Sequence, residues 1–158
     1  MTTTPTTTTL PCLWFDTDGL EAAERYVSLV PDSEITEVVR NPDGSALTVS
    51  FTLAGREYLI LNGGPAYALS PAFSIQLLCE DQAEVDRCWD ALLEGGEESR
   101  CGWLQDRWGV SWQVVPRRLL ELRADPDPAR AQRAVEAMLG MRKLVVAELE
   151  AAADAVPA

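Results

Sequence analysis

The chain has 158 residues, of which 47% are hydrophobic and 24% are charged, and Asp plus Glu outnumber Lys plus Arg by 25 to 13. This length fits one domain, or two small fused repeats that share a core. The net charge of -12 argues against nucleic acid and anionic membranes as partners, because both attract basic proteins.

The chain contains no histidine and 4 cysteines, which are scattered and form no CxxC pair. Catalysis by a Ser-His-Asp or Cys-His pair is therefore excluded, and the commonest zinc and iron ligand is missing. No apolar run approaches the roughly 20 residues of a membrane span, and no secretory signal is visible. Scattered thiols without such a signal indicate a cytoplasmic protein without a disulfide framework.

The first half of the sequence predicts one helix and four strands. Residues 1–9 are mostly threonine and are expected to form a flexible tail. Apolar residues at helical spacing predict a helix over Asp18–Leu29, with Asp18 as its N-cap. Short apolar or alternating runs predict strands at Leu10–Asp16, Ile35–Arg40, Ala46–Leu53 and Glu57–Asn62. Residues 10–62 thus have the order β-α-β-β-β.

The same order restarts after a linker rich in Gly, Pro and Ala, residues 63–72. Phe73–Cys79 is a predicted strand, and Asp81 caps a helix that ends at Gly95-Gly96. The remaining strands are expected near Glu97–Ser99 and in a hairpin over residues 101–116. Residues 73–116 therefore form a second β-α-β-β-β unit, which is an internal repeat in element order.

The hairpin over residues 101–116 contains three of the 5 tryptophans. On its second strand Ser111, Gln113 and Val115 face one way, because side chains alternate along a strand. Gln113 is thus a polar residue in a strand expected to be buried. Its amide must find hydrogen-bond partners, either as a structural tie or as part of a binding site.

The C-terminal extension, residues 117–158, is predicted to be helical. A turn is expected at Leu119–Leu122, a helix from its N-cap Asp127 to about Leu139, and a last helix from Leu144 to about Ala153. The apolar stripe of the last helix predicts packing either on its own domain or on a partner subunit. The sequence leaves both alternatives open.

Five segments of the sequence resemble one known family. They are Pro11–Asp16, Leu61–Pro65, Asp81–Asp86, Cys101–Gln113 and Asp125–Gln132. With the tandem element order, they are similar to the PhnB-like branch of the vicinal oxygen chelate superfamily, which includes glyoxalase I, bleomycin-resistance proteins and extradiol dioxygenases. That branch is often labelled 3-demethylubiquinone-9 3-methyltransferase. The resemblance implies an α+β fold in which tandem βαβββ units form a curved, mostly antiparallel sheet cup around a small-molecule pocket.

Many relatives hold one divalent metal through His or Glu at four pocket-facing strand positions. Carried onto this chain, the resemblance places these positions at Cys12, Asn62, Ser74 or Gln76, and Gln113. Neutral amides and a lone thiol are poor substitutes for a set of carboxylates and imidazoles. We therefore expect a pocket without a metal ion, and no cofactor.

Each candidate residue also has a structural interpretation. Cys12 could be a small buried hydrophobe, and Asn62 could make the turn before Gly63. Gln76 and Gln113 could orient a ligand or tie the two half-sheets together. Three tryptophans could line a pocket that accepts an aromatic ligand, or could pack in a core or dimer interface: Trp14, Trp103 and Trp108.

The sequence favours a small-molecule-binding protein that forms a homodimer, with no catalytic residue assigned. Its expected ligand-binding residues are Cys12, Trp14, Asn62, Ser74, Gln76, Trp103, Trp108 and Gln113. The alternative is an enzyme of the same superfamily, with isomerase, lyase or oxygenase-type chemistry on a small apolar or aromatic metabolite. A methyltransferase is disfavoured, because the glycines of Gly63-Gly64 precede a proline and not the helix of a nucleotide-binding turn.

Overall fold

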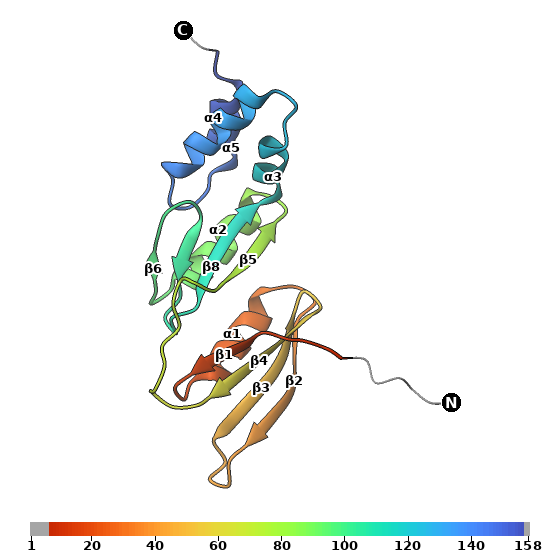
Figure 1. The fold of residues 1–158 in the computed structure, drawn as a ribbon, viewed down its shortest axis with the longest axis vertical. Helices are drawn as coiled ribbons and strands as arrows, with labels where there is room; N and C mark the ends of the chain where they lie inside the picture. The colour runs from red at the N-terminus through yellow and green to blue at the C-terminus, as the bar shows by residue number, and fades with distance from the viewer. Residues whose placement is uncertain (1–6, 157–158) are drawn as a thin grey trace, which may run out of the picture. The chain divides into compact units, whose positions relative to one another are not determined.

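The computed structural model describes residues 7–156, so most of the tail expected over residues 1–9 lies outside the described residues. The chain divides into two compact units, Met1–Leu69 and Ser70–Ala158. The division falls within the predicted linker, residues 63–72. Each unit contains its own four-stranded sheet (Figure 1).

The first unit has the predicted β-α-β-β-β order. Its strands lie in the order β1-β4-β3-β2, with β1 parallel to β4 and the other pairs antiparallel. Its elements are β1 (Cys12–Phe15), α1 (Gly19–Leu29), β2 (Glu34–Arg40), β3 (Ala46–Leu53) and β4 (Arg56–Asn62). Leu13 and Ile60 pair across β1 and β4 and are 2% and 0% exposed. The first residue of α1 is Gly19, which lies so close to β4 that a Cβ at this position would overlap the side chain of Ile60.

The second unit repeats this topology, with the order β5-β8-β7-β6 and a parallel β5–β8 pair. Its elements are β5 (Ser74–Cys79), α2 (Gln82–Leu93), β6 (Glu97–Glu98), β7 (Trp103–Gln105) and β8 (Ser111–Pro116). The predicted cap of α2 is confirmed, because Asp81 Oδ1 accepts a hydrogen bond from the Glu84 backbone N–H at 2.9 Å. The α+β fold with tandem repeats is therefore as predicted.

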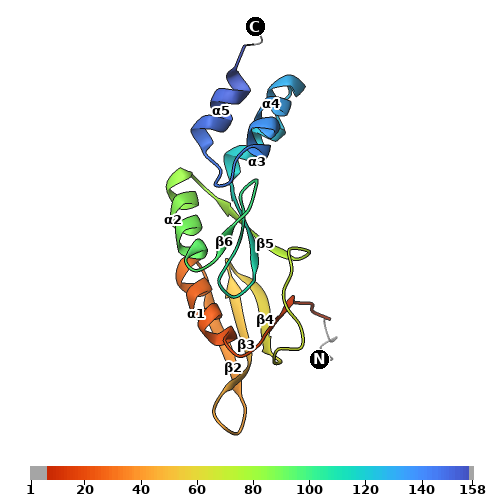
Figure 2. The ribbon, with the colours of Figure 1, turned by 90° about the vertical axis from the view of Figure 1, so that its left-hand side faces the viewer.

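The two faces of the second sheet differ in character. Trp112 and Val114 of β8 are fully buried, and α2 lies along one side of its sheet in Figure 2. The opposite face is here called the open face. Strand register places on it seven polar or aromatic residues: Ser74, Gln76, Glu97, Trp103, Gln105, Ser111 and Gln113.

The C-terminal extension consists of α3 (Arg117–Arg123), α4 (Pro128–Leu139) and α5 (Val146–Asp154). The predicted bounds of α4 are confirmed, and its cap Asp127 accepts a hydrogen bond from the Ala129 backbone N–H at 2.9 Å. The helices share one apolar cluster with the end of β8: Val115, Leu119, Leu122, Ala134, Leu144, Leu149 and Ala153.

The extension packs on its own unit through a side-chain amide of α2. Gln82 Nε2 donates to the Leu144 carbonyl at 3.1 Å, and Gln82 Oε1 accepts from the Val146 backbone N–H at 2.7 Å. The Gly102 backbone N–H also donates to the Arg142 carbonyl at 2.7 Å. Contact of these helices with a partner subunit stays a prediction.

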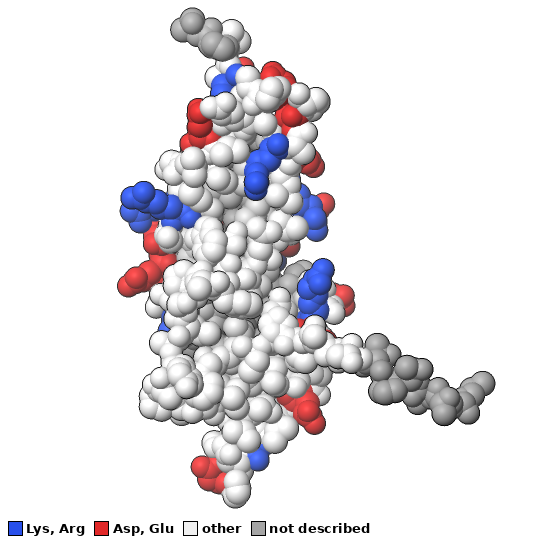
Figure 3. All heavy atoms as spheres, in the orientation of Figure 1, with Lys and Arg blue, Asp and Glu red and all other residues white. Residues whose placement is uncertain are grey.

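The surface and the helix lengths bear on possible partners. Basic and acidic side chains are interspersed on the face shown in Figure 3, and the described residues form no continuous basic patch on this face. Within residues 7–156, no helix has the length and apolar character needed to cross a bilayer.

Candidate functional site

Trp14 lies against the glycine pair that follows β4. Its Nε1 donates to the Gly64 carbonyl at 2.8 Å, and a Cβ at Gly63 would overlap its indole ring. The ring also meets Tyr67 edge to face, with centroids 4.9 Å apart. The glycine pair therefore provides a flat backbone surface for an indole, and Trp14 is held by its own unit.

Asn62 lies at the end of β4, and both ends of its side-chain amide are hydrogen bonded. Asn62 Oδ1 accepts from the Gly19 backbone N–H at 3.0 Å, and Nδ2 donates to the Ala46 carbonyl at 3.0 Å. Its contact with α1 places it on the helix-covered face, whereas Cys12 and Trp14 occupy the other face. The structure thus does not bring Asn62 together with these two residues.

Cys12 is exposed at the start of β1. Partial burial nevertheless raises the pKa of the Cys12 thiol above its ordinary value. A raised thiol pKa lowers the thiolate fraction at neutral pH, and only the thiolate is a good nucleophile or metal ligand. Its surroundings therefore give Cys12 no activation for chemistry.

In the second unit, three of the predicted residues form one hydrogen-bonded chain on the open face. Gln113 Nε2 donates to Ser74 Oγ at 2.9 Å, and Gln76 Nε2 donates to Gln113 Oε1 at 3.1 Å. We call this the amide chain. Both alternatives for the third pocket position, Ser74 and Gln76, belong to it. Gln76 is exposed, so its carbonyl oxygen points to a region that a ligand can reach.

Trp103 connects the amide chain to a cavity. Its backbone pairs with Gln113 across β7 and β8, so the indole and the amide lie side by side on the open face. The half-buried ring lines a cavity of about 220 Å³. The cavity is lined by Pro71, Glu97, Glu98, Ser99, Trp103, Leu104, Gln105 and Ser111.

Trp108 lies in the turn between β7 and β8, apart from that cavity's lining. The guanidinium of Arg107 stacks over its ring, 4.3 Å from the centroid. This is a cation–π contact at the tip of the hairpin. The predicted role of Trp108 in ligand binding therefore has less geometric support than that of Trp103.

Asp106, in the turn between β7 and β8, is not among the predicted site residues. Asp106 is only 4% exposed. Its Oδ1 accepts from the backbone N–H groups of Trp108 and Val110 at 2.9 and 3.0 Å, and its Oδ2 accepts from Trp112 Nε1 at 2.9 Å. The signal was the Asp-x-x-Gly turn, since aspartate commonly bonds to backbone groups two residues on. Asp106 fixes the hairpin that carries Trp103 and Gln113.

The residues present do not fit the divalent metal that the fold family implies. Among residues 7–156 there is no group of three or more His, Cys, Asp or Glu side chains that could hold a metal ion. The Asn62 amide is bonded to backbone groups, and the Gln113 amide is bonded to Ser74 and Gln76. Amide oxygens without a carboxylate or imidazole set are weak ligands.

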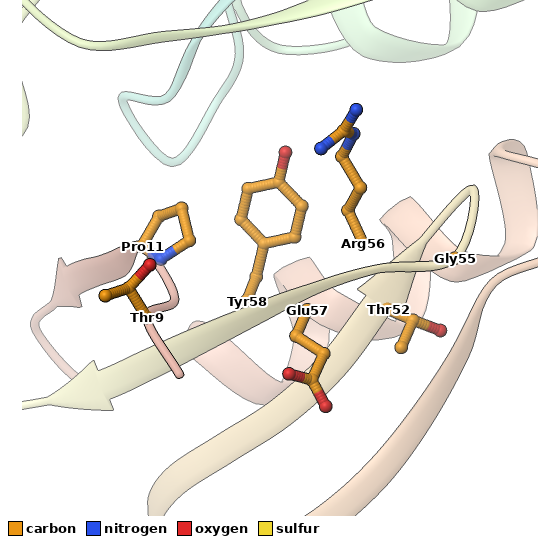
Figure 4. A pocket seen from close by; sticks show the side chains of 7 residues that line it. All are labelled: Thr9, Pro11, Thr52, Gly55, Arg56, Glu57 and Tyr58. Atoms are coloured by element: carbon orange, nitrogen blue, oxygen red, sulfur yellow. The ribbon is translucent and has the colours of Figure 1, made fainter. Parts of the chain in front are cut away.

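The first unit has a separate, wider cleft of about 640 Å³, lined by Thr9, Pro11, Thr52, Gly55, Arg56, Glu57 and Tyr58 (Figure 4). The side chains of Arg56 and Tyr58 point to one side of β4, and that of Glu57 points to the other. Burial raises the pKa of the Tyr58 phenol, and the positive charge of Arg56 partly opposes this rise. None of the predicted site residues lines this cleft.

Comparisons with known proteins agree with the fold. The family described as 3-demethylubiquinone-9 3-methyltransferase matches residues 7–115. A PhnB protein from Bacillus cereus, described as a candidate 3-demethylubiquinone-9 3-methyltransferase, is 27% identical, with a TM-score of 0.66 over 70% of this chain and 99% of that chain. A protein from Pseudomonas aeruginosa is 22% identical, with a TM-score of 0.58 over 70% of this chain and 98% of that chain.

A glyoxylase/bleomycin resistance protein/dioxygenase domain from Frankia is also similar, at 12% identity and a TM-score of 0.48 over 72% of this chain and 93% of that chain. No curated protein matches the chain. The family match ends at residue 115, so it does not extend to the segment Asp125–Gln132, for which a resemblance was also expected. Helices α3–α5 therefore lie beyond the matched region.

Proposed function

We propose that this chain, which belongs to the 3-demethylubiquinone-9 3-methyltransferase family, the PhnB-like branch of the vicinal oxygen chelate superfamily, binds a small molecule without a metal ion. The ligand lies on the open face of the second sheet. It contacts the indole of Trp103 and the exposed end of the amide chain at Gln76.

The observation that carries this proposal is the position of the amide chain beside Trp103 and its cavity. Ligand pockets typically combine an aromatic or apolar wall with a few fixed polar groups. Here Gln113 is held by hydrogen bonds on both sides, so the orientation of Gln76 is set before a ligand arrives. Such preorganisation lowers the entropy cost of binding.

We do not propose that this chain catalyses the methyl transfer that the family's descriptive name mentions. A nucleotide-like methyl donor needs glycines that bring backbone N–H groups and a helix N-terminus to its phosphate or carboxylate. In this chain the glycine pair is in contact with the Trp14 indole, and no helix begins until Gln82. We therefore propose ligand binding in place of methyl transfer.

A thermal-shift screen of aromatic metabolites tests the binding proposal. We expect hits that stabilise the wild-type chain and lose their effect in Gln113→Leu, which keeps the side-chain volume but breaks the amide chain. Gln132→Leu on α4 serves as the control, and it should retain the hits. A broad screen without a stabilising compound, or hits that Gln113→Leu leaves intact, would contradict the proposal.

Elemental analysis of the purified chain tests the metal-free part and the enzymatic alternative together. Stoichiometric zinc, nickel or iron that survives dialysis would contradict binding without a metal and would favour metal-assisted turnover in the same superfamily.

We also propose that the chain forms a homodimer, for which exposed apolar side chains such as Phe73 and Leu78 at the edge strand β5 offer a surface. A solution mass measurement tests this proposal. A particle of 17.3 kDa at high concentration would contradict it.

A further inference from the structure

The cavity beside Trp103 contains a carboxylate whose charge no other described residue compensates. Glu97 pairs with Gln105, and Gln105 pairs with Ser111, so these three residues share the open face. Its neighbour Glu98 faces the other way and forms an ion pair with Arg142 at 2.9 Å. Within residues 7–156, Glu97 has no ion pair. Glu97 is thus the free negative charge of this cavity.

Ser111 provides a second, independent indication of a ligand. Its side chain is only 3% exposed, and it lines the cavity. Its hydroxyl has no hydrogen-bond partner among the described residues, and no side-chain oxygen or nitrogen in this part of the chain is both sealed from solvent and unpaired. The hydroxyl therefore opens into the cavity. A hydroxyl that no protein group binds, and that faces a cavity, is available to hydrogen bond with a ligand.

Trp103 completes the arrangement. It lies two residues before Gln105 on β7, so it is the diagonal neighbour of Glu97, at a typical separation of roughly 7–8 Å across a strand pair. Aromatic faces attract cations because of the ring quadrupole, and indole does so best. An indole face and a free carboxylate at this spacing can together surround one positive charge.

We propose that this cavity binds a small organic cation that also carries a hydrogen-bonding group. The positive centre lies between the Trp103 indole and the Glu97 carboxylate, and the hydrogen-bonding group reaches the Ser111 hydroxyl. A volume of about 220 Å³ is ample for a cation of a few heavy atoms, since one water molecule needs roughly 10–15 Å³ of such volume. This inference rests on the proposed function and names the chemical class of its ligand.

Choline and its uncharged carbon isostere, 3,3-dimethyl-1-butanol, test the inference, because the two compounds differ in charge and hardly in shape. Proton–nitrogen correlation spectra of the full chain report each compound through the Trp103 indole N–H signal, which Trp103→Phe identifies. We expect choline to bind about tenfold more tightly than the isostere, in line with a cation–π contact at a half-buried indole that is supported by a carboxylate.

Two matched variants test whether the Glu97 carboxylate is the group that recognises the cation. Glu97→Gln should remove most of the preference for choline, whereas Glu37→Gln, which removes the same charge from the exposed strand β2, should leave it unchanged. Ser111→Ala should weaken both compounds by a similar factor, since both carry the hydroxyl group.

Three outcomes would overturn the inference. Equal affinity for choline and the isostere would exclude recognition of charge while leaving small-molecule binding intact. A preference that survives Glu97→Gln would place the cation elsewhere. Failure of both compounds to shift the Trp103 signal at tens of millimolar would remove the cation site, whereas the metabolite screen would still decide the broader binding proposal.

Discussion

Asn62 on β4 accepts a hydrogen bond from the backbone N–H of Gly19, the first residue of α1, at 3.0 Å. Asp18 is the N-cap residue of α1, as predicted, but its side chain makes no cap hydrogen bond. The first N–H groups of a helix need such partners, because they have none within the helix. A strand residue 43 positions along the chain supplies the partner here.

Asn62→Ala should therefore lower the free energy of unfolding by about 2–3 kcal/mol, because it removes a helix cap and a second bond to the Ala46 carbonyl. Asn62→Asp keeps an acceptor at the positive end of α1 and should lose about half as much. Urea unfolding measures both changes. Asn41→Ala, in the exposed β2–β3 turn, is the control, and an equal loss there would contradict the capping role.

Gly63→Ala should destabilise the chain by displacing the Trp14 indole, which occupies the position of the added methyl group. We expect a loss of about 2–3 kcal/mol, as is typical of overpacking. Combining it with Trp14→Leu should give less than the sum of the two single losses, because the substitutions act on one contact. Denaturant unfolding of all three variants measures the coupling, and strict additivity would exclude the contact.

Asp106→Asn should lower the free energy of unfolding by about 2–4 kcal/mol, because the amide nitrogen that replaces one carboxylate oxygen cannot accept a hydrogen bond. Depending on how the amide is turned, either the Trp112 indole N–H or the two backbone N–H groups lose their acceptor. The matched control is Asp127→Asn, since asparagine caps helices as well as aspartate does. Thermal unfolding compares the two variants. Similar melting temperatures for both would show that the hairpin does not depend on this buried carboxylate.

Much of the fold could be predicted, because the signals lie within short windows. The bounds of α4 and the cap at Asp81 depend on residues only a few positions apart. The structural roles of the Asn62 and Asp106 side chains could not be predicted in this way. Asn62 bonds to a helix that precedes it by 43 positions, and a polar turn residue such as Asp106 gives no sign of its burial.

The candidate site was predicted in part for the same reason. Alternation along β5 and β8 suffices to place Gln76 and Gln113 on one face, and the repeat makes these strands neighbours. Which partners their amides take depends on side-chain rotamers, which no pattern in the sequence records. The cavity at Trp103 is also lined by Glu97, which belongs to a strand of only 2 residues. The β-propensity of two glutamates is too weak to predict such a short strand.

Stability should fall in acid partly through Asp125. The backbone N–H of Asp127 and the guanidinium of Arg130 hold the pKa of the Asp125 carboxyl below its ordinary value. Since the folded state binds this proton less tightly than the unfolded state, the contribution is full above about pH 4 and is lost as pH falls through the lower folded pKa. Asp125→Asn should flatten this acid limb in thermal melts between pH 7 and 2. Asp16→Asn, whose side chain has no hydrogen bond among the described residues, should leave it unchanged, and equal acid limbs in all three proteins would contradict the assignment.

The open face of the second sheet is proposed to bind a small molecule without a metal ion. The most direct test is a proton–nitrogen correlation titration of chelator-treated protein with the most stabilising compound from the metabolite screen. We expect saturable shifts of the Trp103 indole signal and of the Gln76 and Gln113 side-chain amide signals, with unchanged affinity after chelation. Shifts confined to other residues, or binding that requires added metal, would contradict it.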